Sequence, residues 1–275
     1  MTVTSKQDFF LMLIMKLPMY AALSLLIWKL SSTEINLLSD AAAYISYAGL
    51  ALLLIYEIIT AYHVNKGIFT EPVADIHRYD FKQVAVLNIL YFATFGSELA
   101  VVSMLPLFFQ ETFNLSVVLS GLLASSYAFM NLVSRPLGGL LSDRFGRKST
   151  LQVLTAGLAI GYALMASVNE SYSLALAVIL AMSCSFFVQA GEGAVFAVVP
   201  LIKRSLTGQI AGMTGAYGNV GAVVYLTVFA MVSYQVFFMV IAITALVGFL
   251  TLFLFKEPTG TIVEVMPDGS LAEIK

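Results

Sequence analysis

The segment SRPLGGLLSDRFGRK, residues 134–148, joins a charge inside an apolar run to a polar turn, and it decides the class of fold. Arg135 is the one charged residue between Val117 and Ser142, and the run ends at Asp143. At about 1.5 Å of helical rise per residue, Arg135 lies about 12 Å from that end, near the middle of a hydrocarbon layer about 30 Å thick. Because an arginine there costs about 2.5 to 3.5 kcal/mol, we expect it to face protein or a water-filled cavity and to serve a function.

The composition is that of a membrane protein. The chain is 60% hydrophobic and 11% charged, with a mean hydropathy of +0.92. A net charge of -2 without a basic stripe argues against nucleic acid as a partner. One cysteine, Cys184, and two histidines provide no set of metal ligands. No nucleophile with its base and no phosphate-binding loop is recognisable, so we expect neither an enzyme nor a cofactor.

Apolar runs of about 20 residues predict an all-α membrane protein with about eight transmembrane helices. We place them at residues 9–30, 42–62, 83–109, 115–142, 149–168, 172–200, 208–232 and 235–255. The connections on the side of the termini carry eleven Lys and Arg residues, and those on the opposite side carry one. The excess of positive charge predicts a multi-pass protein of the cytoplasmic membrane with both termini in the cytoplasm.

Polar segments divide these helices into parts. Residues 63–82 are interpreted as a cytoplasmic loop between a helical pair, residues 1–62, and a six-helix block, residues 83–255. Residues 256–275 are interpreted as a flexible cytoplasmic tail, because they are polar and too few to build a core.

The turn after Arg135 resembles the loop motif of the major facilitator superfamily, G-x-x-x-D-(R/K)-x-G-(R/K)-(R/K). The resemblance implies a latch for one conformational state. Gly139 would let helices approach closely, Gly146 would permit the turn, and Asp143 would pair with Arg147 or meet a helix N-terminus. The alternative is an ordinary turn in a positively charged loop. The matching residues are Gly139, Asp143, Arg144, Gly146, Arg147 and Lys148.

Three segments of the block resemble the nitrate/nitrite porter family, in its bacterial and cyanobacterial nitrate permease branch. They are residues 91–98, 134–139 and 212–221, and residues 95–100 and 189–193 most resemble that branch. The resemblance implies the C-terminal six-helix half of a major facilitator fold, preceded by a helical pair. It also implies transport of nitrate, nitrite or both across the cytoplasmic membrane by alternating access.

Depth along the helices groups the candidate binding residues. Tyr91 lies about 13 Å into its helix, close to the depth of Arg135, and Asn219 and Glu192 lie at about 16 Å. We expect the guanidinium of Arg135 to bind the planar anion, with hydrogen bonds from Tyr91 and Asn219 and the ring of Phe95 against the anion. The resemblance implies the same roles for the arginine, the tyrosine and the phenylalanine.

Other interpretations of these residues stay open. The two aromatic rings fit ordinary helix packing, and Arg135 fits a structural ion pair with Glu98 or Glu192. Either carboxyl also fits a proton-coupling group. Pro136 is expected to kink the helix beside Arg135.

Glycines recur every three residues along one predicted helix. Such a strip permits close approach of membrane helices, and the resemblance implies a gating helix that slides during alternating access. Static tight packing explains the strip equally well. The glycines are Gly212, Gly215, Gly218 and Gly221.

A complete porter of this family has two six-helix halves with the anion between them. We therefore expect this chain to be the C-terminal portion of a porter that needs an N-terminal half, encoded upstream or separately, and to be inactive alone. Its first two helices are either an extra pair between the halves or core helices five and six. The alternatives are a porter for another small organic anion and a non-transporting membrane module.

Overall fold

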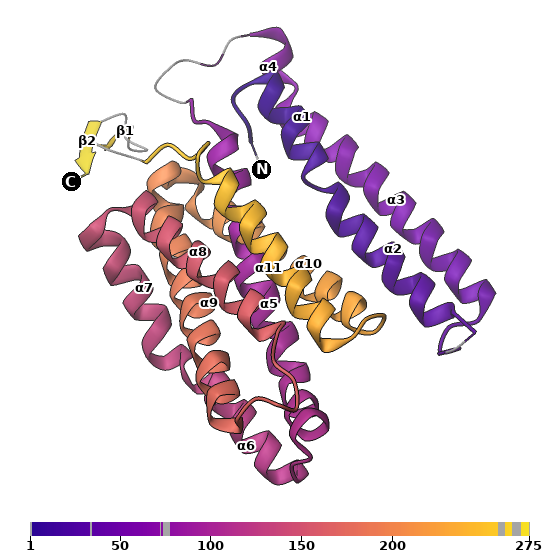
Figure 1. Cartoon of the computed structure of the whole chain (residues 1–275). Coiled ribbons are helices and arrows are strands. Elements are labelled where there is room, and N and C mark those ends of the chain that lie inside the picture. The colour runs from indigo at the N-terminus through magenta and orange to yellow at the C-terminus, as the bar shows by residue number, and fades with distance from the viewer. Residues whose placement is uncertain are drawn as a thin grey trace.

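Long apolar helices form almost the whole of the computed structural model of this chain, which describes residues 2–33, 35–71, 73, 78–257, 262–265 and 271–274. Figure 1 shows a helical pair lying beside a larger helical bundle. The first helix of the pair is divided into α1 (Lys6–Ile14) and α2 (Leu17–Ser31), and the second is α3 (Asp40–Asn65). The short α4 (Gly67–Thr70) follows. The bundle contains α5 (Phe81–Phe113), α6 (Val117–Phe129), α7 (Asn131–Phe145), α8 (Arg147–Met165), α9 (Leu174–Ile202), the 3-10 turn η2 (Arg204–Leu206), α10 (Thr207–Phe229) and α11 (Tyr234–Thr251).

Polar residues at the ends of the apolar runs determine where the helices begin. In each case a side-chain oxygen accepts from a backbone N–H of the first helical turn, which would otherwise lack a partner. These N-caps are Ser39 for α3, Asp80 for α5, Ser116 for α6, Ser173 for α9 and Ser233 for α11. The signals that separate the spans are therefore local to the sequence.

Two of the predicted helices are interrupted. The first divides at Met15 and Lys16, just before Pro18 in the first turn of α2. The fourth divides at Met130, and Pro136, which we expected to kink the helix beside Arg135, lies inside α7. A proline ring conflicts with the carbonyl four residues before it, which for Pro136 is that of Leu132, two residues beyond the break at Met130.

Six stretches are long and apolar enough to cross a membrane within the described residues: Lys6–Ser31, Asp40–Asn65, Phe81–Phe113, Val117–Phe145, Leu174–Ile202 and Tyr234–Thr251. Helices α8 and α10 lie where the other two spans were predicted, with 19 and 23 residues. Arg147 and Lys148 begin α8, and glycines and threonines make α10 less apolar. The prediction of an all-α membrane protein is confirmed.

Glycines set the closest approaches between helices near Arg135. A Cβ atom on Gly138 of α7 would collide with the backbone of Ala190 in α9, and one on Gly193 of α9 would collide with the carbonyl of Arg135. Gly139, expected to permit this approach, has its nearest such neighbour at 3.8 Å, the oxygen of Gly193. The pairing of α7 with α9 therefore depends on Gly138 and Gly193, and it fixes Arg135 against α9.

The two predicted polar segments contain some regular structure. α3 continues to Asn65 and α4 lies inside the predicted loop 63–82, of which residues 72 and 74–77 fall outside the described part. In the tail, β1 (Ile262–Val265) pairs antiparallel with β2 (Leu271–Ile274), with Ile262 opposite Ile274. The sequence interpretation of the tail as flexible did not anticipate this hairpin. Tail residues 258–261, 266–270 and 275 lie outside the described part.

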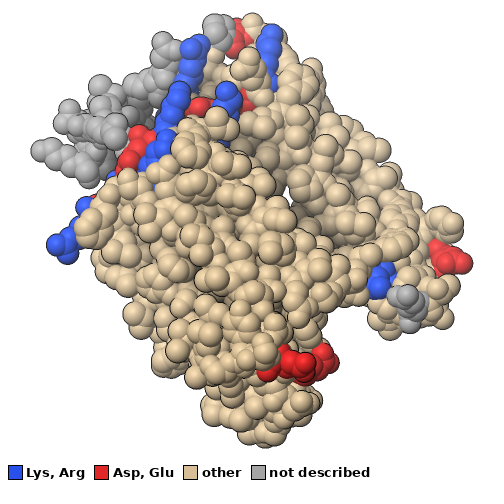
Figure 2. All heavy atoms as spheres, in the orientation of Figure 1, with Lys and Arg blue, Asp and Glu red and all other residues tan. Residues whose placement is uncertain are grey.

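Charged side chains are unevenly distributed over the surface. On the face of the molecule that Figure 2 shows, most Lys and Arg side chains lie in the upper part of the view, where both chain ends lie. Few charged side chains lie below them. Many large apolar side chains are exposed instead, among them Tyr44, Ile45, Val118 and Leu132. Exposed apolar surface of this extent suits contact with lipid.

Candidate anion-binding site

Arg135 lies on α7 at the centre of a polar cluster inside the bundle. Its Nη2 donates to the phenolic oxygen of Tyr91 on α5 at 2.7 Å. The same nitrogen lies 2.6 Å from Oε2 of Glu192 on α9. The Glu192 side chain is fully buried, whereas that of Arg135 is 37% exposed. The guanidinium is thus held by two groups, and the Arg135 side chain remains partly exposed.

Aromatic rings form one wall of this cluster. The rings of Tyr91 and Phe95 are stacked, with centroids 5.2 Å apart and planes 8° apart. The Arg135 guanidinium carbon lies 5.9 Å from the centre of the Phe95 ring, within range of a cation–π interaction. Phe196 of α9, which the sequence did not single out, meets Tyr91 edge-on at 5.0 Å. Its position one helical turn after Glu192 could have indicated it.

Some N–H donors of the Arg135 guanidinium remain available to a ligand. The guanidinium carries five N–H donors, and Glu192 and Tyr91 both engage Nη2. Across the described residues, Nη1 and Nε have no hydrogen-bond partner, and the Tyr91 hydroxyl accepts from Arg135 and donates to no other group. Each parallel pair of N–H donors on a guanidinium includes Nη2, so the donors of Arg135 that remain free are single N–H groups on Nη1 and Nε, each able to bind one oxygen of a small anion.

Asn219 does not join this cluster, contrary to expectation. Its side chain is exposed, and its amide donates at 3.0 Å to the carbonyl of Gly215 in its own helix. Depth along a helix was estimated correctly enough to place Asn219 in the same layer, but depth carries no information on rotation about the helix axis. The buried face of α10 carries Thr214, Tyr217 and Gly218 instead.

The glycine strip of α10 divides between two faces. A Cβ on Gly218 would meet the rings of Phe95 and Tyr91, and one on Gly221 would meet the Phe92 carbonyl and the Gly96 backbone. Gly212 and Gly215 have nothing within 4 Å of such an atom among the described residues. A three-residue step falls about 60° short of a turn, so Gly212 and Gly221 point in nearly opposite directions. Only the second half of the strip contacts α5.

Glu98 belongs to a neighbouring network and does not pair with Arg135. Its Oε1 accepts from the Asn131 amide at 2.9 Å and from the Gln189 amide at 3.4 Å. Gln189 also donates to the carbonyl of Tyr127 at 3.1 Å. Asn131 was not singled out in the sequence, since an asparagine in an apolar helix gives no signal of its partner.

The loop motif forms a turn between α7 and α8. Gly146 has a φ of 92°, a conformation that favours glycine, and the Arg147 guanidinium lies 3.2 Å from Asp143, the ion pair expected from the sequence. Arg144 lies beside Phe145, with 5.6 Å between its guanidinium carbon and the ring centre.

The chain after α11 adds two contacts to this turn. Glu257 accepts from the Arg147 backbone N–H at 2.5 Å, and Lys148 donates to the Phe255 carbonyl at 2.7 Å. Glu257 thus lies at the N-terminus of α8, where the helix dipole favours a negative charge. It was missed because its partner is 110 residues earlier in the chain.

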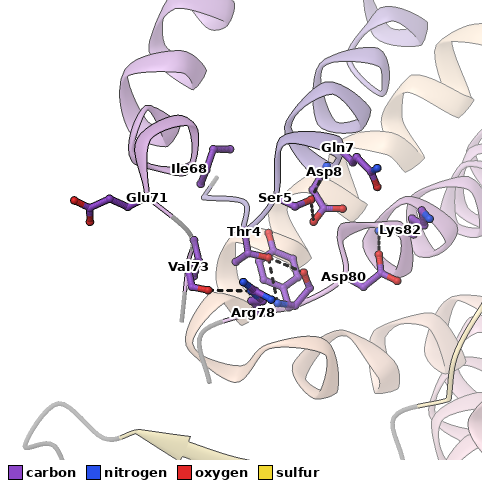
Figure 3. Close-up of a pocket in the computed structure, with 11 residues that line it drawn as sticks. Thr4, Ser5, Gln7, Asp8, Ile68, Glu71, Val73, Arg78, Asp80 and Lys82 are labelled. Atoms are coloured by element: carbon purple, nitrogen blue, oxygen red, sulfur yellow. Dashed lines mark hydrogen bonds between the residues drawn. The ribbon is translucent and has the colours of Figure 1, made fainter. Parts of the chain in front are cut away.

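A separate cavity of about 660 Å³ lies between the N-terminal segment, α4 and the start of α5 (Figure 3). Figure 3 shows Arg78 bonded to Val73, and Ser5 to Asp8, within its lining. Burial raises the pKa of the adjacent Tyr79 phenol well above its ordinary value, so this group is a neutral donor to the Thr2 carbonyl. None of the residues that line this cavity belongs to the Arg135 cluster.

The fold and the cluster define an all-helical membrane protein with a cationic site inside its bundle. The chain belongs to the Major Facilitator Superfamily, whose family model matches residues 87–266. It is 48% identical to the nitrate/nitrite transporter NrtP of a Picosynechococcus species and 42% identical to that of Nostoc punctiforme, over 96% and 94% of this chain and 53% of each relative. A high-affinity nitrate transporter of rice is 38% identical over 50% of this chain and 28% of its own length. The chain spans about half the length of the first two relatives.

Proposed function

We propose that this chain is the C-terminal portion of a secondary active transporter that moves nitrate, nitrite or both across the cytoplasmic membrane by alternating access. The observation that carries the proposal is that Arg135, next to Tyr91 and Phe95 in the bundle, keeps N–H donors on Nη1 and Nε free. The similarity to nitrate/nitrite transporters supports the choice of anion. The function is transport, without a cofactor and without an enzymatic reaction.

The chemistry of the site suits a small planar anion. The guanidinium provides charge and the free N–H donors of Nη1 and Nε, and the Tyr91 hydroxyl has its proton free to donate because it only accepts from Arg135. Phe95 keeps one side of the site apolar, which strengthens the electrostatic attraction by excluding water. Nitrate and nitrite fit this description.

A second half completes the site in this proposal. The anion lies between two six-helix halves, and a second cation from the N-terminal half completes the clamp. Within this chain we assign residues 1–62 to an extra helical pair, 63–82 to a cytoplasmic loop, 83–255 to the six-helix half and 256–275 to a cytoplasmic tail. Both termini are placed in the cytoplasm. The packing of α2 against α10 supports a pair attached to the outside of the six-helix half.

Reconstitution tests the proposal. The full chain is produced alone and together with the N-terminal half of the Picosynechococcus relative, and vesicles containing each are assayed for uptake of labelled nitrate. We expect uptake by the complex and none by the chain alone, because one guanidinium makes half of a clamp. Uptake of acetate or lactate in place of nitrate would favour a porter for organic anions. No uptake of any anion by the well-folded complex would favour a non-transporting membrane module.

A further inference from the structure

The Glu192 carboxyl is the most deeply buried charged group in contact with Arg135. Its side chain has no exposed surface, and within the described residues its carboxylate forms one ion pair, that with Arg135 at 2.6 Å, and lies within hydrogen-bonding reach of the Glu98 carboxyl. A buried carboxylate is stable only when a charge or hydrogen bonds compensate it. Glu192 therefore depends on the guanidinium that the proposed substrate would also use.

A second carboxyl nearby differs in its surroundings. The Glu98 carboxyl lies within hydrogen-bonding reach of Glu192, an arrangement that requires a proton on one of the two, and it accepts hydrogen bonds from the Asn131 and Gln189 amides. Those amides compensate a negative charge on Glu98 whether or not Arg135 is engaged. Of two interacting carboxyls, the one with fewer donors takes the proton first. By this comparison the proton goes to Glu192.

Few charged or titratable groups surround Glu192 in the described part of the chain. The charged or titratable groups that face it are Arg135 on α7 and Tyr91 and Glu98 on α5. Helices α6 and α10 contain no Asp, Glu, Lys or Arg, and α8 carries Arg147 and Lys148 only in its first turn. The phenols Tyr127 of α6 and Tyr162 of α8 are hydrogen-bonded to each other at 2.8 Å.

We propose that Glu192 couples the anion to a proton, an inference that rests on the proposed function. With Glu192 ionised, the pair with Arg135 has no net formal charge and attracts an anion weakly. When a proton from water forms an O–H bond on the Glu192 carboxyl, the Arg135 charge becomes available to the anion. Anion and proton then bind together and are released together, the O–H bond breaking as the ion pair re-forms. By reciprocity, each increases the affinity of the site for the other.

The test uses vesicles that contain the full chain together with the N-terminal half described above. Two rates are measured: nitrate accumulation driven by a pH gradient, and exchange of nitrate for nitrate without a gradient. We expect Glu192→Gln to reduce accumulation by about tenfold or more while exchange continues, because the neutral amide mimics the protonated state. Glu192→Asp, which keeps a carboxyl, is expected to retain accumulation. Glu111→Gln, which removes a carboxyl from the far end of α5, is the matched control and is expected to retain both.

Each of the other possible outcomes contradicts one statement of the proposal. If Glu192→Gln accumulates nitrate like the unmodified complex, or if Glu98→Gln alone abolishes the response to the gradient, the assignment of the proton to Glu192 is wrong. Loss of exchange in Glu192→Gln would make this residue part of the binding or folding machinery and would also overturn the coupling role. If the unmodified complex neither exchanges nor accumulates nitrate, the proposed function fails, and the coupling fails with it.

Discussion

At the scale of single residues, the site is the Arg135 guanidinium with its contacts to Tyr91, Glu192 and Phe95. The sequence predicted Arg135 because a cation in an apolar run needs compensation, and it predicted Tyr91 and Phe95 by depth. It left open whether Arg135 pairs with Glu98 or Glu192, and the structure has the Glu192 pair. Asn219 points away from the Arg135 cluster, because its direction around α10 depends on how that helix packs against α5. Distance along a helix follows from sequence, whereas rotation requires the neighbouring helix.

The hydrogen bond between Tyr91 and Arg135 allows a prediction at this scale. Removing the hydroxyl in Tyr91→Phe takes away a bond to a charged group, which contributes about 1.5 kcal/mol or more, and a donor for the anion. We expect the KM for nitrate uptake by the complex to rise about tenfold or more. Tyr234→Phe is the matched control, because its hydroxyl bonds to Glu111 at an exposed position. Equal KM values for the two variants would exclude Tyr91 from the site.

At the scale of elements, glycines decide which helices touch. The sequence predicted a close contact along α10 from the repeat of four glycines, and the structure has it only at Gly218 and Gly221. It also predicted the close approach of α7 at Gly139, where the structure has it at the adjacent Gly138. In both cases the glycine pattern predicted the position of the helix–helix contact to within about one helical turn. The exact residue depends on helix rotation, which no local pattern specifies.

The division of the glycine strip allows a stability prediction. In Gly221→Ala the new methyl group would lie 2.5 Å from the Phe92 carbonyl and 3.1 Å from the Gly96 Cα, and both are backbone atoms that cannot turn away. Overpacking of this kind costs about 1 to 3 kcal/mol. Gly212→Ala adds its methyl group in open space and favours the helix by about 0.5 to 1 kcal/mol.

The measurement is the thermal unfolding midpoint of the full chain in detergent. The midpoint of Gly221→Ala should fall by several degrees, and that of Gly212→Ala should stay the same or rise. If both variants shifted alike, the two faces of the strip would not differ as the structure has them.

At the scale of the whole molecule, the order of the helices followed from the sequence with little error. Apolar runs predicted eight spans, of which six are long and apolar enough to cross a membrane within the described residues, and the ends of the runs lie within a few residues of the helix ends. The interruptions at Met15 and Met130 were missed, as were the tail hairpin and the contact of Glu257 with α8. The contact of Glu257 depends on packing between distant segments, whereas the interruptions and the hairpin are local features that the pattern of apolar runs did not indicate. The chain spans about half the length of the first two relatives. The second cation of the proposed clamp is therefore also a question about the whole molecule.

The most direct test of the central claim, that Arg135 binds the transported anion, is the rate of nitrate uptake by the complex with Arg135→Lys. Lysine keeps the charge but lacks the free N–H donors of Nη1 and Nε, so kcat/KM for nitrate should fall by about tenfold or more. Lys82→Arg, an exchange between the same two residue types at an exposed position, should leave it unchanged. Uptake by Arg135→Lys as fast as by the unmodified complex would contradict the account.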